Sequence, residues 1–242
     1  VALAGQEFYE ESLNVFFKAL ADTDKNLAKA KTLNNAGVSF IKLDDPSSAI
    51  IYLNKAIQED PNNVSAHFNL ANALRNVGET ESSIQVYMEA LKIDPKHANS
   101  IIYYSLALKT LGKFEESILF CKKALEIRQD WGMVHRHLSS MVKYKKDNEH
   151  IKIMLSLIDD KNLLKEDKMH LCYGLSKAFE DIKEYKKAFS FLSKANNLHR
   201  EDINYSSQNS KNYFKAVKGI FSEEFYENSK NSLSELGEGI IF

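Results

Sequence analysis

The sequence predicts an all-α protein, a right-handed solenoid of antiparallel helix pairs with a non-repeat helical segment at its C-terminal end. Three observations lead to this prediction. The 242 residues contain only three prolines and nine glycines, so few positions interrupt a helix. Apolar residues recur at i, i+3, i+4 and i+7, which is the spacing of one helix face. The sequence also resembles itself when it is shifted by 34 residues.

The repeat is visible in fixed residues. Pro61 and Pro95 lie 34 residues apart, and the same shift places Gly78 on Gly112. Another such series is Ala56, Ala90 and Ala124. Each unit carries two apolar stripes separated by a short break, which predicts a helix–turn–helix. One such unit cannot bury both apolar faces, so the units are expected to stack.

Small and turn-forming residues support these helix pairs. Asp45 before Pro46 predicts an N-cap followed by the first helical residue. Gly78 and Gly112 suit helix ends that need a left-handed residue. Small residues, which let paired helices approach closely, occupy the first helix (Gly37, Ala71, Ser105, Ser139) and the second (Ala49, Ser83, Ser117).

The pattern resembles the tetratricopeptide repeat (TPR), W-x2-L-G-x2-Y followed by A-x3-F, A and P. The three regular units are residues 30–63, 64–97 and 98–131, and in the third Gln129 takes the place of the proline. In the first unit the matching residues are Leu33, Ala36, Gly37, Phe40, Ala49, Leu53, Ala56 and Pro61. The resemblance implies a superhelix whose first helices line a concave groove.

The flanking segments fit this repeat less well. Residues 1–29 are expected to form N-terminal helices, either a partial repeat or a cap. Residues 132–166 read as a degenerate fourth repeat with a spacer, and 167–202 as a fifth TPR-like repeat. The remaining segment, 203–242, is expected to form a helix with apolar residues Tyr213 and Phe214 and a linker to a missing domain. The final Ile240-Ile241-Phe242, after two glycines, reads as the start of a buried strand and as a sign that the chain is a fragment.

Residues 135–242 also resemble the N-terminal TPR region of bacterial TPR–sulfotransferase fusion proteins. The matching stretches are 170–178, 185–189, 213–221 and 239–242. The resemblance implies that a Pro-Arg-Ser-Gly-Thr loop follows the strand and binds the donor nucleotide PAPS (3′-phosphoadenosine 5′-phosphosulfate). That loop would lie beyond Phe242, so no catalytic or cofactor-binding residue is assigned to this chain.

Composition limits the partners. The formal net charge of -1 argues against nucleic acid, because phosphate binding needs a basic surplus. No stretch approaches the length of a membrane span. Cys121 and Cys172 fall on core positions of the repeat, so we expect buried thiols and a cytoplasmic protein rather than a disulfide.

Catalytic and metal chemistry is not expected. His135 and His137 are the densest histidines, but residues two apart on a helix point in different directions and do not chelate one ion. We expect His135 to pack in the core and His137 to face the groove. Nothing in the sequence combines a nucleophile, a base and an oxyanion site. The chain alone is therefore not predicted to be an enzyme.

Candidate binding residues flank the packing positions of the first helices. They are Asn34, Asn35, Phe68, Asn69, Asn72, Arg75, Tyr103, Lys109 and Arg136. Asn35 and Asn69 are placed similarly to the asparagine ladder of O-GlcNAc transferase, in which amides hold a peptide backbone. The alternative is that they are solvated surface amides. The mixture of amides, aromatic rings and cations favours an extended peptide or protein with some acidic character.

Two functions follow. The chain is either the substrate-recognition arm of a PAPS-dependent sulfotransferase, which we favour, or a stand-alone TPR scaffold that binds a partner protein without any enzymatic domain. The sequence does not identify the partner or the oligomeric state.

Overall fold

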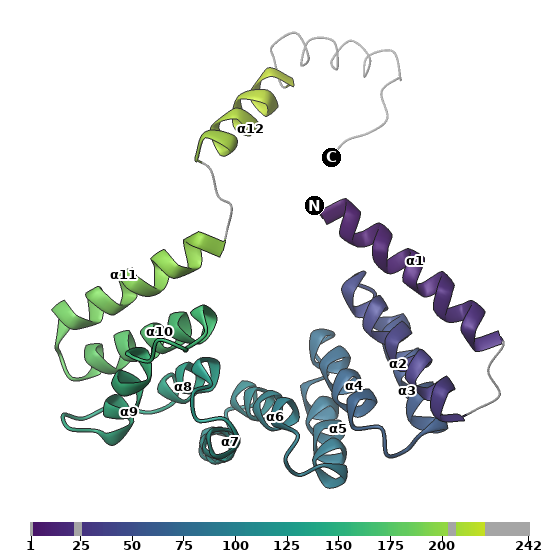
Figure 1. Cartoon of the computed structure of the whole chain (residues 1–242), viewed down its shortest axis with the longest axis horizontal. Helices are drawn as coiled ribbons and strands as arrows, with labels where there is room; N and C mark the ends of the chain where they lie inside the picture. Colours follow the sequence, from purple (N-terminus) through teal and green to yellow (C-terminus); the bar gives the residue numbers. More distant parts are fainter. Residues whose placement is uncertain (1, 22–25, 203–206, 221–242) are drawn as a thin grey trace, which may run out of the picture. The chain divides into compact units, whose positions relative to one another are not determined.

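The computed structural model describes residues 2–21, 26–202 and 207–220, and every regular element in these ranges is an α-helix (Figure 1). The chain divides into two compact units, Val1–Ala195 and Asn196–Phe242. The repeat region lies within the first unit. The all-helical fold predicted from the sequence is confirmed.

The first unit begins with α1 (Ala2–Ala21) and continues as a series of helix pairs. The helices of the regular pairs are α2 (Asn26–Lys42) with α3 (Pro46–Glu59), α4 (Val64–Asn76) with α5 (Thr80–Ile93), and α6 (Ala98–Thr110) with α7 (Phe114–Ile127). The second helix of each pair also packs against the first helix of the next pair. This succession is the stacking that the 34-residue period predicts.

The ends of these helices follow the predicted signals. Asp45 Oδ1 accepts a hydrogen bond from the backbone N–H of Ser48 at 3.0 Å, and Pro46 is the first residue of α3. Gly78 and Gly112 follow α4 and α6 with φ values of 87° and 74°. Only a residue without a Cβ adopts this conformation at little cost, so both glycines end the first helix of a pair.

Close packing within the first pair depends on Gly37. A Cβ atom added at Gly37 would lie 2.5 Å from Cγ of Leu53, a side chain with no exposed surface. The other small residues named above, from Ala49 to Ser139, are also buried. Small side chains therefore set the distance between paired helices, as predicted.

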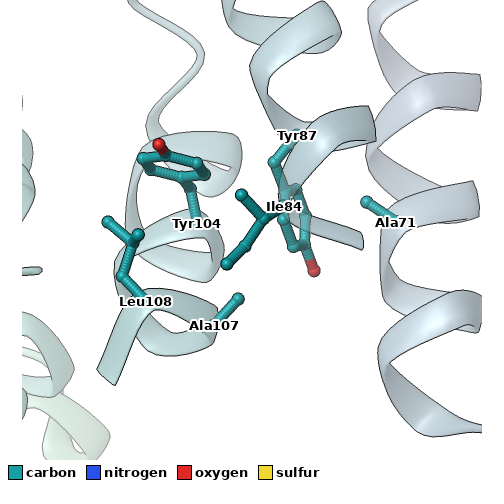
Figure 2. Packing of buried hydrophobic residues seen from close by; sticks show 6 residues of the cluster. All are labelled: Ala71, Ile84, Tyr87, Tyr104, Ala107 and Leu108. Atoms are coloured by element: carbon teal, nitrogen blue, oxygen red, sulfur yellow. The ribbon is translucent and has the colours of Figure 1, made fainter. Parts of the chain in front are cut away.

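The core is continuous from one pair to the next. Figure 2 shows the cluster in which Ala71 of α4 and Tyr87 of α5 meet Tyr104 and Leu108 of α6. All members of this cluster are buried. Because the cluster draws on two successive pairs, neither pair could bury it alone. Cys121 and Cys172 are likewise buried free thiols, which confirms their predicted core positions.

The fourth pair departs from the regular pattern. Its helices are α8 (Gly132–Ser139) and α9 (Glu149–Ile158). Helix α8 packs mainly against α10 (Lys165–Asp181), the first helix of the next repeat. The carboxylate of Asp167 accepts a hydrogen bond from the backbone N–H of Gly132 at 2.9 Å and forms an ion pair with Arg128. Gly132 lacks a side chain, and this lets the backbone of Asp167 approach the start of α8.

The prediction that His137 faces the groove is wrong. Its side chain is only 7% exposed, and its Nε2 lies 3.4 Å from the Ser117 hydroxyl between α7 and α8. His137 lies on the side of α8 that meets α7, so it packs between the third and fourth pairs.

The last helices are α11 (Tyr185–Asp202), which runs from the first unit into the second, and α12 (Ser207–Ile220). The predicted C-terminal helix is therefore present over residues 207–220, and Tyr213 and Phe214 on it are exposed. The predicted strand at 239–242 lies outside the described residues. Among the helices that the structure describes, all are too short or too polar to cross a membrane.

Candidate interaction face on the first helices

The predicted binding residues all lie on the first helices of four successive pairs. We call this surface the first-helix face: Asn34, Asn35, Phe68, Asn69, Asn72, Arg75, Tyr103, Lys109 and Arg136, from α2, α4, α6 and α8. Asn35 and Arg136 are exposed, and the other side chains are partly buried. The structure therefore places every one of these residues where it retains some access to solvent.

From α2 to α9, carboxylates are confined to one kind of helix, whereas basic residues occur on both. The first helices α2, α4, α6 and α8 carry six basic residues and no Asp or Glu. All the acidic residues of the helices from α2 to α9 lie on the second helices α3, α5, α7 and α9. A chain whose net charge is close to zero thus presents a cationic surface on one set of helices.

The amides of this face are joined to their neighbours. Asn69 Nδ2 donates to Asn34 Oδ1 at 2.9 Å, which links the first and second pairs. Asn72 Oδ1 accepts a hydrogen bond from the Tyr87 hydroxyl, with 2.5 Å between the two oxygens. Burial raises the pKa of Tyr87 to about 12, so this hydroxyl stays protonated and remains a donor at neutral pH. Asn69 and Asn72 therefore contribute to the packing of the repeats, and Asn35 is the exposed amide of the set.

Aromatic rings hold Arg75 in place. The rings of Phe68 and Tyr103 meet edge to face with centroids 5.4 Å apart, and the Arg75 guanidinium lies 5.6 Å from the centre of the Tyr103 ring. Arg75 Nε is buried and has no hydrogen-bond partner among the described residues. Because this nitrogen has no accessible surface, a binding partner would meet other atoms of the Arg75 side chain, which is partly buried.

The other two cations of the face, Lys109 and Arg136, each contact the next repeat. Lys109 Nζ donates to the Ser140 hydroxyl at 2.7 Å, and the Arg136 guanidinium stacks 4.3 Å from the centre of the Tyr173 ring. Within the described residues, neither Lys109 nor Arg136 forms an ion pair with a carboxylate. Both side chains are therefore positioned by uncharged partners, a hydroxyl and an aromatic ring.

A further feature of the cations was missed by sequence reasoning. Arg75, Lys109, Lys143 and Lys177 recur every 34 residues, but the last two pair with Asp181. Burial acts to raise the pKa of Asp181, yet hydrogen bonds from Lys143 and Lys177 outweigh it and lower the pKa to about 2. Asp181 therefore pairs with the third and fourth cations of the series, Lys143 and Lys177. The 34-residue spacing was the signal that could have shown the series.

The fold is that of a helical repeat protein, with a TPR-like stack of helix pairs. Family models described as tetratricopeptide repeat match residues 30–63, 52–85 and 102–130. These ranges thus match tetratricopeptide repeats, as the periodicity predicts, and they contain most of the first-helix face.

Comparison with individual proteins supports the same fold. One relative is an uncharacterized protein of Aquifex aeolicus (strain VF5), 31% identical over 90 residues, which are 37% of this chain and 12% of that protein. The chain therefore spans only a small part of that relative.

Among solved structures, YrrB is described as a TPR protein with an unusual peptide-binding site. It matches with a TM-score of 0.56 and 14% identity, over 76% of this chain and 91% of YrrB. MamA from Desulfovibrio magneticus RS-1, residues 41 to the end, matches with a TM-score of 0.56 and 18% identity, over 75% of this chain and 99% of that one. At these identities the similarity shows the fold.

Proposed function

We propose that this chain is a protein-interaction scaffold that binds an extended, acidic segment of a partner protein along the first-helix face. The observation that carries the proposal is the separation of charge, because α2, α4, α6 and α8 carry basic residues and no carboxylate. Such a surface attracts an acidic segment and repels a basic one. The reported peptide-binding site of YrrB, which shares the fold, is consistent with this use.

The residues of the face have complementary roles. The partly buried cation of Arg75 lies beside two aromatic rings, which suits an acidic residue next to an apolar one. Lys109 and Arg136 continue the positive charge on α6 and α8. The exposed amide of Asn35 donates and accepts, so it suits a peptide backbone. An extended peptide reaches several of these groups at once.

Charge reversal on the face tests the proposal. The probe is a twelve-residue peptide that alternates acidic and aromatic residues, and its affinity is measured by calorimetry with the full chain. We expect Lys109→Glu with Arg136→Glu to weaken binding by at least about tenfold, because two attractive charges become repulsive. The measured affinity should also fall as salt concentration rises.

The matched control is Lys92→Glu with Lys152→Glu. It changes the net charge by the same amount but lies on the second helices α5 and α9, where both lysines are exposed. We expect this variant to bind the peptide like the wild type. Equal losses in the two double variants would show that net charge alone drives binding and would overturn the proposal.

A second candidate function is the recognition arm of a PAPS-dependent sulfotransferase. It is favoured by the resemblance of residues 170–178 and 185–189 to TPR–sulfotransferase fusions of bacteria. The free thiols of Cys121 and Cys172 support a cytoplasmic location for either candidate. The coding sequence after Phe242 tests the sulfotransferase candidate. A Pro-Arg-Ser-Gly-Thr loop within the next few codons would support this candidate, and any other sequence there would remove it.

A further inference from the structure

A cavity lies on the second-helix side of the solenoid, between α7, α8 and α9. Its volume is about 620 Å³. Its walls include the apolar side chains of Leu125, Leu138, Ile153 and Leu157, and the rings of His135 and His150 also line it. None of these residues belongs to the first-helix face. A cavity of this size with apolar walls and a few polar groups has the properties of a binding site.

The preceding repeat has a smaller cavity at the equivalent place, lined by two aromatic rings. The equivalent cavity, 34 residues earlier, measures about 270 Å³ and is lined by Tyr104 and Phe120. These two rings meet edge to face with centroids 4.6 Å apart. The corresponding residues of the fourth repeat are Leu138 and Met154, and Met154 is fully buried, with its sulfur beside Ser139. The larger cavity therefore lacks the aromatic pair that occupies its equivalent.

The histidines give this cavity an uncharged aromatic side. Tyr144, His150 and His135 stack in series, with interplanar angles of 23° and 21°. A chain of hydrogen bonds joins the Tyr144 hydroxyl to His150 Nδ1 at 2.6 Å and His150 Nε2 to His135 Nδ1 at 2.8 Å. His135 Nε2 lies 2.7 Å from the Gln129 carbonyl oxygen, to which it donates. All four ring nitrogens are thus engaged within the protein.

The protonation state of these rings also bears on the ligand. Burial lowers the pKa of His135, and burial together with the neighbouring His135 lowers the pKa of His150 to about 4. Both rings are neutral at pH 7 and offer no charge or free donor. The exposed residues Lys122 and Glu126 also line the cavity and bring one charge of each sign, so no net field selects a charged ligand.

We propose that the α7–α9 cavity is a second binding site, which takes an uncharged aromatic side chain of a partner protein. The missing aromatic pair supplies the space, the apolar walls supply the hydrophobic contact, and the stacked histidines supply a flat aromatic surface. The site is independent of the cationic face, so a partner could occupy both.

The test uses the full chain with indole and the blocked tripeptide Gly-Trp-Gly as probes, followed by NMR of the histidine rings and by calorimetry. We expect saturable binding of both, with a dissociation constant of about 1 mM or tighter, and shifted resonances of His135 and His150. The tripeptide should compete with indole. Butylammonium and butyrate should not bind. Saturable binding of either charged probe, or a tripeptide that does not compete, would overturn the proposal.

Two tryptophan variants locate the binding. Ile153→Trp places a large ring at a wall residue that is 42% exposed, and it should weaken indole binding at least about tenfold by filling the cavity. Leu119→Trp is the control, because Leu119 is the residue 34 positions earlier, is 51% exposed and lines neither cavity. Equal effects of the two variants would contradict the assignment. Lys109→Glu with Arg136→Glu should leave indole binding unchanged, which separates this site from the proposed peptide site.

Discussion

Lowering the pH from 7 to 5 is expected to reduce the free energy of unfolding by about 4 kcal/mol. His137 and His150 are buried neutral, and burial lowers the pKa of each from 6.5 to about 4. The unfolded chain binds protons at these sites below pH 6.5, whereas the folded chain does not until about pH 4. The stabilisation is therefore complete above pH 6.5 and is lost as the pH falls toward 4, at about 2 kcal/mol per histidine by pH 5.

Urea unfolding followed by circular dichroism at pH 7 and pH 5 measures this loss. The expected loss of about 4 kcal/mol is a large share of the roughly 5–15 kcal/mol by which a typical domain is stable. The control is His137→Gln with His150→Gln, which removes the two titrating groups and should show a much smaller difference between the two pH values. Equal stability of the wild type at pH 7 and pH 5 would contradict the burial of these rings in their neutral form.

Gly132→Ala is expected to destabilise the first unit by about 3 kcal/mol or more. A Cβ atom at this position would lie 2.6 Å from Cα of Asp167, so the new methyl group meets backbone. Relief requires α10 to move away from α8, which also weakens the hydrogen bond from Gly132 N–H to the Asp167 carboxylate. Thermal and urea unfolding of the variant measure the loss.

Two other glycine variants are compared with Gly132→Ala for their loss of stability. Gly37→Ala meets the Leu53 side chain, which can shift by rotation, so a smaller loss of about 1–2 kcal/mol is expected. Gly219→Ala on α12 has open space around the new methyl group and should not lower stability. A Gly132→Ala protein as stable as the Gly219→Ala protein would show that α8 and α10 are not in close contact.

Local signals in the sequence were sufficient for the regular repeats. Asp45, Gly78 and Gly112 each act within a few residues of their own position, and the structure places them as predicted. The buried thiols of Cys121 and Cys172 followed from the 34-residue register. These features need no knowledge of distant contacts, so periodicity and turn chemistry were enough.

The fourth pair could not be predicted in the same way. Its helix α8 ends at Ser139, and the contacts of Asp167 with Gly132 and Arg128 span more than 30 residues. Applying the register of the regular repeats to α8 therefore gave the wrong environment for His137. The hydrogen bond between His135 and His150 could not be predicted, because no repeat spacing links the two residues. The candidate binding residues lie on first helices, as the repeat register predicts. The hydrogen bond from the Tyr87 hydroxyl to Asn72 was not predicted, because it joins a core residue to a partly buried one 15 residues away.

The central claim, that the first-helix face binds an acidic segment, is tested most directly by comparing two peptides of the same length. One is the acidic and aromatic twelve-residue peptide, and in the other each Asp and Glu is replaced by Asn and Gln. Calorimetry with the wild-type chain should show the acidic peptide binding at least about tenfold more tightly, because the cations on α4, α6 and α8 meet no carboxylate of their own helices. Equal affinity for the two peptides would contradict the account.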